Sequence, residues 1–218
     1  MPHADRTRQA ADDPGPALIG YYLTHPQVEV DPDAPVPQWR LSTRGHARIV
    51  AIAERAWLTT ISRIVSSKER KAVETAEIIA ARRGATVEIH AEMGENDRSS
   101  TGFLQPDRFE AAADEFFCHP QTSWNGWESA VDAQSRIVSA VERTLARHGC
   151  DRAVLFVGHG AVGTLLKCHI ANRAISRSED QPAGGGNVFA FGLATRRLLC
   201  EWTPVEEFDG AGNDGRHA

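Results

Sequence analysis

The sequence has few cysteines and places none of them in a pair that could bind zinc or exchange disulfides. Only 4 of the 218 residues are cysteine, and no C-x-x-C spacing occurs. A structural zinc site or a dithiol redox site is therefore not indicated. We expect reduced and mostly buried thiols.

Long apolar runs and a strong charge of one sign are also missing. The first residues, MPHADRTRQAADDPGPA, lack the apolar core of a secretory signal, and no later stretch approaches the roughly 20 apolar residues that cross a bilayer. The formal net charge is -5, so no overall positive field would gather nucleic acid or an anionic membrane. We expect a cytoplasmic protein without nucleic-acid or membrane partners, which binds any anionic ligand in a local cationic pocket. No signal for an oligomeric state is visible.

The ends of the chain differ in composition from the middle. Residues 1–16 are polar and close on Pro14-Gly15-Pro16, and residues 205–218 are acidic and glycine-rich. Both segments are predicted to be flexible tails. This leaves residues 17–204 as a single domain, which is long enough for one sizeable core.

Short apolar runs alternate with segments of helical period through this domain. Strands are predicted at 18–23, 61–65, 86–90, 153–157, 187–193 and 198–202, the last two as a hairpin. Helices are predicted at 42–56, 106–117 and 127–148, from a capping box of Ser66 and Glu69 onward, and from near Ala161. The alternation predicts an α/β protein, a three-layer α/β/α sandwich with a mostly parallel central sheet.

A histidine flanked by two glycines follows the predicted strand 153–157. Gly158 and Gly160 allow a tight turn into a helix, whose free N–H groups would face the same space as the His159 ring. Ligands of such sheets gather beyond the carboxyl ends of the strands. The pattern favours an oxyanion site, but it is short, and a structural histidine bonded to the backbone fits it nearly as well.

A second histidine follows the first predicted strand, in Thr24-His25-Pro26. Pro26 does not continue a central strand and holds His25 extended at its end. Two strand-terminal histidines, one near each end of the chain, indicate one shared site at the edge of the sheet.

Four segments of the chain follow one another in an order that is typical of a known family. They are LTHPQ (23–27), SKERKAVETA (67–76), MGE (93–95) and VGHGAV (157–162). The order resembles that of the histidine phosphatase superfamily, the phosphoglycerate mutase-like enzymes, whose motifs are R-H-G, S-P-L-x-R-A-x-x-T-A, L-x-E and a strand ending in H-G. The resemblance implies a metal-independent phosphatase, without a cofactor, that acts on a small phosphorylated molecule or a phosphoprotein.

The chemistry of such a site can be assigned to particular residues. A neutral imidazole is a good nucleophile toward phosphorus near pH 7, so His25 is the predicted nucleophile, forming a phosphohistidine. His159, Lys71 and the helix N-terminus at Gly160 would stabilise the phosphoryl oxygens. Glu95 matches the acid of L-x-E and would protonate the leaving group, with Glu92 as the second choice.

The chain departs from the family pattern at three positions that bear on phosphate binding. Thr24 and Pro26 stand where the first motif has arginine and glycine, and Lys71 aligns with the arginine of the second motif. Losing one charge-assisted hydrogen bond of roughly 1.5 to 3 kcal/mol would weaken phosphate binding about 10- to 100-fold. Thr24 then offers only a hydroxyl, and the candidate replacement cations are Arg44, Lys68, Arg70 and Arg98. Each of them is otherwise a solvated surface charge, although Arg98 lies in a predicted site loop directly after Glu95.

Three other functions remain open. A degenerate family member could bind a phosphorylated ligand or a partner without turnover, as Thr24 and Lys71 suggest. A metallohydrolase could use His25, His159, Glu95 and Asp97, although no metal-ligand spacing is present. A mutase is conceivable, but residues 96–126 are short for a substrate-enclosing insertion. Specificity is expected in the loops 27–41 and 96–126, which name no substrate.

Overall fold

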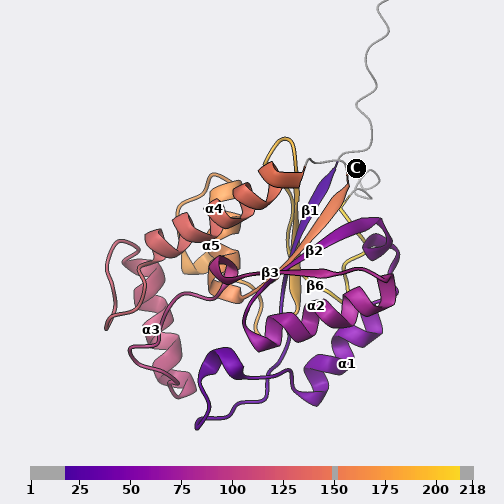
Figure 1. Cartoon of the computed structure of the whole chain (residues 1–218). Coiled ribbons are helices and arrows are strands. Elements are labelled where there is room, and N and C mark those ends of the chain that lie inside the picture. The colour runs from indigo at the N-terminus through magenta and orange to yellow at the C-terminus, as the bar shows by residue number, and fades with distance from the viewer. Residues whose placement is uncertain (1–17, 149–151, 212–218) are drawn as a thin grey trace, which may run out of the picture.

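Six strands form one sheet in the computed structural model, which describes residues 18–148 and 152–211. The strand order is β3-β2-β4-β1-β5-β6; β1, β2, β3 and β4 run parallel, and β5 is antiparallel to both β1 and β6 (Figure 1). The strands are β1 (Ile19–Thr24), β2 (Ile61–Ser67), β3 (Val87–His90), β4 (Ala153–Gly158), β5 (Asn187–Gly192) and β6 (Leu198–Pro204). The predicted strands and the hairpin of the last two are thus confirmed.

Helices cover both faces of the sheet. They are α1 (Thr43–Ile52), α2 (Arg70–Arg83), α3 (Pro106–Cys118), α4 (Ala130–His148) and α5 (Gly160–Ile170), with short 3-10 helices at Val36–Gln38, Ala56–Thr60, Ala91–Met93 and Arg177–Glu179. In Figure 1, α1 and α2 lie on one side of the sheet, and α3, α4 and α5 lie on the other. This confirms the three-layer α/β/α sandwich with a mostly parallel sheet.

The strands contribute side chains to two separate hydrophobic cores, because neighbouring side chains of a strand point to opposite faces of the sheet. Tyr22 and Phe156 pack in a core with residues of α3, α4 and α5. Leu23 and Leu155 pack in a second core with residues of α1 and α2. The sheet is therefore held from both sides, which fixes the edge where its parallel strands end.

The start of α2 differs from the prediction of a capping box at Ser66. Ser66 belongs to β2, where it is paired with Val157 of β4, and its hydroxyl donates to the carbonyl of Ser67. The helix begins at Arg70, and its N-cap residue Glu69 makes no side-chain capping bond. The strand pairing therefore outweighs the local capping signal. The predicted buried side of this helix is confirmed: Ala72, Ala76, Ile79 and Ala80.

The segment after β6 packs on the domain, so the prediction of a tail from residue 205 is wrong for residues 205–211. Val205 and Phe208 are buried in the second core. Arg55 donates a hydrogen bond to the carbonyl of Phe208 at 3.4 Å and forms an ion pair with Asp209. Two apolar side chains anchor an otherwise polar segment. The predicted tail 1–16 and residues 212–218 lie outside the described residues.

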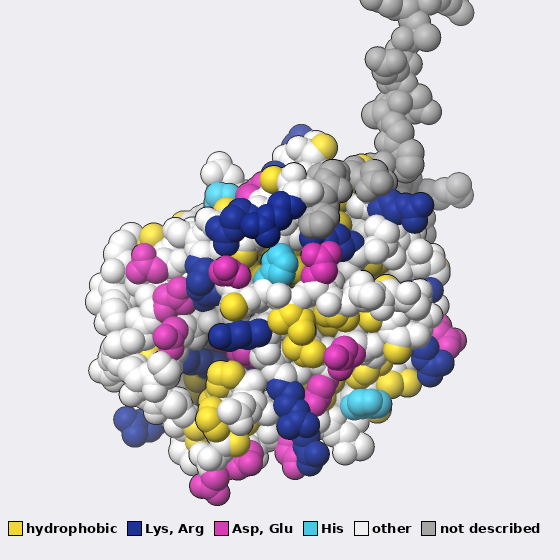
Figure 2. Space-filling view, in the orientation of Figure 1, with side chains coloured by type: hydrophobic (Ala, Val, Ile, Leu, Met, Phe, Trp, Pro, Cys, Tyr) yellow, Lys and Arg dark blue, Asp and Glu magenta, His cyan; other side chains and the backbone are white. Residues whose placement is uncertain are grey.

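The outer surface carries both signs of charge. Acidic and basic side chains are interspersed on the face shown in Figure 2. No helix within the described residues is long and apolar enough to cross a membrane. Cys168 is buried, as predicted for the cysteines, but Cys118 is exposed and Cys200 is half-buried, so the prediction of burial is wrong for these two. Cys150 lies outside the described residues.

Candidate active site

The two strand-terminal histidines meet at the edge of the sheet. β1 and β4 are parallel neighbours with Thr24 paired to Gly158, so His25 and His159 leave the sheet side by side. The backbone N–H of His25 donates to the Gly158 carbonyl at 3.0 Å. The ring centroids lie 5.2 Å apart, edge to face. The structure thus brings together the two imidazoles on which the prediction of a shared site depended.

The His25 ring is held in one tautomer by its neighbour in the sequence. Nδ1 lies 2.8 Å from the carbonyl oxygen of Pro26. Because a carbonyl only accepts, Nδ1 carries the proton and Nε2 keeps a free lone pair. Burial, together with the charge of Lys71, lowers the pKa of His25 to about 4, so the ring is neutral near pH 7.

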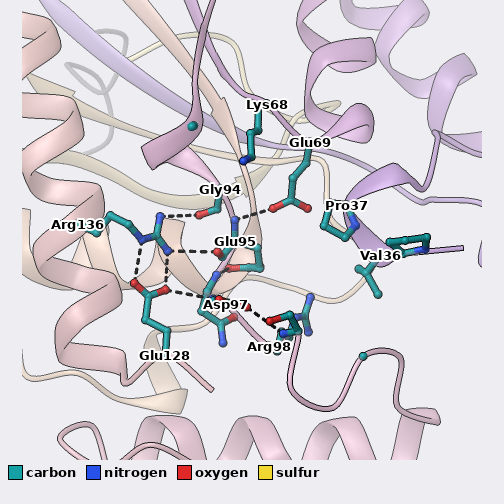
Figure 3. Close-up of a pocket in the computed structure, with 15 residues that line it drawn as sticks. Val36, Pro37, Lys68, Glu69, Gly94, Glu95, Asp97, Arg98, Glu128 and Arg136 are labelled. Carbon is teal, nitrogen blue, oxygen red and sulfur yellow. Dashed lines mark hydrogen bonds and ion pairs between the residues drawn. The ribbon is translucent and has the colours of Figure 1, made fainter. Parts of the chain in front are cut away.

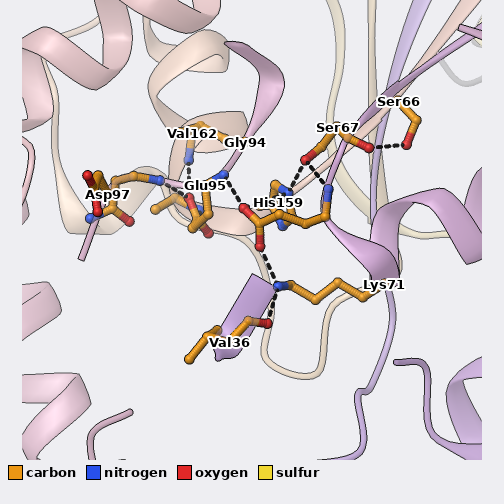
Figure 4. A network of polar contacts seen from close by, with 12 residues as sticks. Val36, Ser66, Ser67, Lys71, Gly94, Glu95, Asp97, His159 and Val162 are labelled. Atoms are coloured by element: carbon orange, nitrogen blue, oxygen red, sulfur yellow. Dashed lines mark hydrogen bonds and ion pairs between the residues drawn. The ribbon is translucent and has the colours of Figure 1, made fainter. Parts of the chain in front are cut away.

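His159 is fully buried and tied to three parts of the fold. Its backbone N–H donates to the Tyr22 hydroxyl at 3.1 Å. Its Nε2 lies 2.8 Å from Ser67 Oγ (Figure 4). The same nitrogen lies 3.4 Å from Glu69 Oε1. Burial lowers the pKa of this ring well below its usual value. Nδ1 is buried and has no hydrogen-bond partner among the described residues.

Lys71 lies at the site, but its ammonium group is paired. Nζ is 2.5 Å from Glu69 Oε2 and donates to the Val36 carbonyl at 3.0 Å. Glu69 Oε1 accepts a hydrogen bond from the Glu95 N–H at 2.8 Å. Burial alone would raise the pKa of Glu69, but His159 and Lys71 lower it below its usual range. A carboxylate of the chain therefore faces the groups predicted to bind phosphate.

Glu95 places its carboxyl group at the N-terminus of α5. Its oxygens accept hydrogen bonds from the N–H groups of Ala161 and Val162, at 3.3 and 3.1 Å. Burial raises the pKa of Glu95, which favours a protonated acid. Glu92, the second choice, is exposed, and its backbone carbonyl rather than its carboxyl group is used, by Arg136.

An ion pair fixes the turn that carries Glu95. Arg136 of α4 pairs with Glu128 at 2.7 Å and donates to the carbonyls of Gly94 and Glu95 at 3.0 and 3.2 Å (Figure 3). Glu128 in turn accepts from the N–H of Asp97 at 3.1 Å. α4 thus holds the loop that bears the proposed acid.

Of the predicted replacement cations, Arg98 alone lines the cavity that contains His25. Its guanidinium lies 4.8 Å from the ring centroid of Phe109 and 5.8 Å from that of Trp127, and no carboxylate of the described residues pairs with it. Its charge lowers the pKa of both His25 and His159, after the larger effect of burial. The guanidinium is therefore available to an anion.

The other predicted cations lie farther out. Arg70 is exposed and pairs with Glu74 one helical turn away. Arg44 is exposed on α1. Neither lines a cavity that contains His25 or Glu95, so their prediction as substrate ligands is not supported by their positions. Lys68 is exposed and lines the larger of these cavities.

Thr24 does not face the site as predicted. It is fully buried, its hydroxyl donates to Gln181 Oε1 at 2.7 Å, and it accepts from the Asn187 N–H at 3.0 Å. It therefore ties β1 to the loop before β5. Gly160 begins α5 and lines the cavity at His25; a Cβ there would lie 2.3 Å from Gln181 Nε2, so a larger residue would require the Gln181 side chain to move.

Two cavities meet at the loop of residues 95–98. One of about 370 Å³ is lined by His25, Gly160 and aromatic side chains of α3. The other, of about 650 Å³, is lined by Glu69, Lys68 and residues 35–37 (Figure 3). Both include Glu95, Asn96 and Arg98. Parts of the loops 27–41 and 96–126 thus line the two cavities, and their role in specificity stays a prediction.

Sequence reasoning missed three polar residues of the site. Ser67 stands at the serine of the family segment S-P-L-x-R-A, but its contact with His159 depends on the register of β2 and β4. Asn96 is 4% exposed, and its side-chain Nδ2 has no partner among the described residues. Glu69 did have a signal, because it stands where the family segment S-P-L-x-R-A has leucine.

The metal centre considered from the sequence does not form. Within residues 18–148 and 152–211, no group of three or more histidine, cysteine, aspartate or glutamate side chains is arranged to hold a metal ion. His25, His159, Glu95 and Asp97 all belong to this part of the chain.

Comparison with known proteins assigns the fold and the family. The model of the histidine phosphatase superfamily (branch 1) matches residues 30–199. The chain therefore belongs to the histidine phosphatase superfamily. The matched range begins after His25, which the structure nevertheless places against His159. No curated protein matches the chain.

Solved structures with the same fold are distant in sequence. Mycobacterial glucosyl-3-phosphoglycerate phosphatase is 22% identical, with a TM-score of 0.66 over 86% of this chain and 97% of that one. Bacillus stearothermophilus YhfR is 20% identical, with a TM-score of 0.71 over 83% and 93%. The alpha-ribazole phosphatase of Shigella flexneri is 14% identical, with a TM-score of 0.70 over 89% and 98%. These likenesses establish the fold.

Proposed function

We propose that the chain is a metal-independent phosphatase that hydrolyses a small phosphorylated substrate, or a phosphoprotein, through a phosphohistidine on His25. One observation carries this proposal: a neutral imidazole with a free Nε2 lies against a second buried imidazole at the wall of a cavity. A neutral ring nitrogen of this kind is the form that attacks phosphorus.

The first half of the reaction transfers the phosphoryl group to the enzyme. His25 Nε2 attacks phosphorus, and the bond between phosphorus and the leaving oxygen breaks. The carboxyl group of Glu95 gives its proton to that oxygen, so the product leaves as a neutral alcohol. The raised pKa of Glu95, caused by burial, supports this role.

The second half returns the enzyme to its starting state. The Glu95 carboxylate takes a proton from water as the water oxygen attacks phosphorus. The bond between phosphorus and Nε2 breaks, phosphate leaves, and His25 is neutral again. One carboxyl group therefore acts in both directions, as microscopic reversibility requires.

Stabilisation of the phosphoryl oxygens is assigned to groups around His25. The guanidinium of Arg98 supplies a planar, charged donor. His159 and Lys71 supply further donors. The N–H groups of Ala161 and Val162 in the first turn of α5, which were also predicted to bind phosphate, already donate to Glu95. Arg98 thus takes the part of the arginine that Thr24 replaces.

The cavity beside His25 suits a small organic leaving group. Its volume of about 370 Å³ falls within the range of small-molecule sites. Phe109, Phe117 and Trp127 supply an apolar wall, and Arg98 supplies positive charge. The mycobacterial glucosyl-3-phosphoglycerate phosphatase has been solved with inorganic phosphate and with VO3, which supports a phosphorylated ligand for the shared fold.

A second candidate is a member of the family that binds a phosphorylated ligand or a partner without turnover. The Glu69 carboxylate favours it, because this group already occupies Lys71 and faces His159. A negative charge at this position opposes the binding of a phosphate dianion.

The test compares the parent with His25→Ala on activated aryl phosphates, with acid-quench trapping of the phosphoenzyme. His46→Ala is the matched control, because His46 is exposed on α1. We expect His25→Ala to lose about 1000-fold or more in kcat/KM and all phosphohistidine, and His46→Ala to keep both. Equal rates for His25→Ala and the parent would refute the proposal. Calorimetric binding of vanadate without turnover of any phosphoester would select the second candidate.

A further inference from the structure

One carboxylate of the chain lies among the groups that a phosphate would need. Glu69 Oε2 is 2.5 Å from Lys71 Nζ, and Oε1 accepts from the Glu95 N–H at 2.8 Å. The same Oε1 lies 3.4 Å from His159 Nε2. Figure 4 shows Lys71, Glu95 and His159 close together in this network. An ammonium group, an imidazole and a backbone amide therefore surround a single anion.

This arrangement is shielded from water. The side chains of Lys71 and Glu69 are 4% and 8% exposed, and that of His159 is fully buried. Charges in such surroundings attract and repel more strongly than at the surface. A phosphate dianion at Lys71 would therefore meet direct repulsion from Glu69 while it remained in place.

The Glu69 side chain lies beside a cavity into which it can rotate. It is the N-cap residue of α2 but makes no side-chain capping bond, so its movement would not uncap the helix. Glu69 also lines the cavity of about 650 Å³ (Figure 3). Rotation of the carboxylate toward this cavity would release Lys71 and His159 together.

We propose that Glu69 is an internal competitor for phosphate: its carboxylate occupies Lys71 and His159, and a phosphate monoester binds these groups only by displacing it. Carboxylate and phosphate oxygens accept the same charge-assisted hydrogen bonds, so one anion substitutes for the other. The inference deepens the proposed function, because it rests on this site being a phosphate site. Glu69 is a positioning residue here and takes no part in the chemistry.

A purely structural role for Glu69 predicts the opposite outcome when the charge is removed. If the carboxylate only neutralised Lys71 and held His159, its loss would loosen the site and weaken anion binding. If it competes with phosphate, its loss strengthens anion binding. The direction of the change separates the two roles.

The experiment titrates vanadate and inorganic phosphate into the full-length parent, Glu69→Gln and Glu77→Gln by calorimetry. Glu77 is exposed on α2, so Glu77→Gln removes the same charge from the same helix outside the site. We expect Glu69→Gln to bind both anions about 10- to 100-fold more tightly than the parent, and Glu77→Gln to match the parent. Equal or weaker binding by Glu69→Gln would overturn the proposal.

A further variant guards against misfolding, because Glu69→Gln leaves Lys71 buried without a counter-charge. In the double variant Glu69→Gln/Lys71→Met both charges are gone, and we expect the gain in affinity to disappear. If Glu69→Gln folds only in phosphate, its unfolding temperature should rise with phosphate concentration, since phosphate then replaces the carboxylate. Failure of Glu69→Gln to fold at any phosphate concentration, while the double variant folds, would overturn the proposal.

Turnover of aryl phosphate, measured alongside, separates this inference from the proposed function. Tighter anion binding by Glu69→Gln without turnover by any variant would support the competitor and refute the phosphatase. Turnover with a trapped phosphohistidine, but no gain in affinity, would support the phosphatase and refute the competitor.

Discussion

Replacing Arg98 by leucine removes the one predicted replacement cation that lies near both His25 and Glu95. The guanidinium lies over the ring of Phe109, 4.8 Å from its centroid, and beside Trp127. Leucine keeps an apolar contact with these rings but loses the charge and the planar donors. The substitution therefore separates phosphate binding from packing.

The expected loss follows from the number of contacts that the guanidinium would make. One charge-assisted hydrogen bond to phosphate is worth roughly 1.5 to 3 kcal/mol, which corresponds to about 10- to 100-fold in affinity or kcat/KM. The lost cation-π contacts cost about 0.5–1 kcal/mol of folding free energy. For a domain of this size, that lowers the unfolding temperature by only a few degrees, about 1–4 °C.

The assay measures vanadate affinity, kcat/KM on an aryl phosphate and the unfolding temperature. Arg44→Leu is the matched control, since Arg44 is exposed on α1 and its replacement removes the same charge away from the cavities. We expect Arg44→Leu to resemble the parent in all three measurements. Retention of anion affinity within about twofold by Arg98→Leu, or an equal loss in Arg44→Leu, would refute the assignment of Arg98.

Three other predictions concern the frame of the site. Tyr22→Phe should lower the free energy of unfolding by about 1–3 kcal/mol in urea titrations, because the buried backbone N–H of His159 loses its acceptor; an unchanged midpoint would contradict this. Gly158→Ala should cost more than Tyr22→Phe, since the new Cβ would lie 2.2 Å from the Tyr22 hydroxyl; an equally stable variant would show that the turn is looser than described. Burial, with the charge of Lys71, lowers the pKa of His25 from 6.5 to about 4. Between these two pH values the unfolded chain is protonated at His25 and the folded protein is not, so the free energy of unfolding decreases as the pH falls. His25→Ala should therefore lose less stability than the parent between about pH 7 and pH 4.5 in urea unfolding, and identical losses would contradict the lowered pKa.

The local sequence around each of the two histidines predicted its place at the end of a strand, but local sequence alone does not bring the two into contact. Each imidazole follows an apolar run that ends at a turn, so the position of both at strand ends was predictable from the local order of residues alone. Their contact required β1 and β4 to be adjacent and parallel, with Thr24 paired to Gly158. Neither apolar run specifies which strand becomes its neighbour, because that choice depends on how the whole sheet assembles.

The roles of the cations and carboxylates were not predictable from local sequence patterns. Arg44, Arg70 and Arg98 were all candidates for the phosphate-binding cation, and only the place of Arg98 directly after Glu95 favoured it, because the sequence does not show where a side chain points. The structure separates them: Arg98 lies on a loop that α4 holds through Arg136 and Glu128, whereas the other two are exposed to solvent. Glu69 lies in the second motif, yet its role depends on contacts with Lys71, Glu95 and His159 from different segments.

The amino-acid sequence by itself determined the alternation of strands and helices, the three-layer architecture and the two histidines at strand ends, because periodicity and turn chemistry act over a few residues. Only the tertiary structure decided which charges meet. It paired Lys71 with Glu69, turned Thr24 inward and left the Arg98 guanidinium without a carboxylate partner in the described part of the chain. These contacts depend on burial and strand register, which are set by segments that are far apart in the sequence.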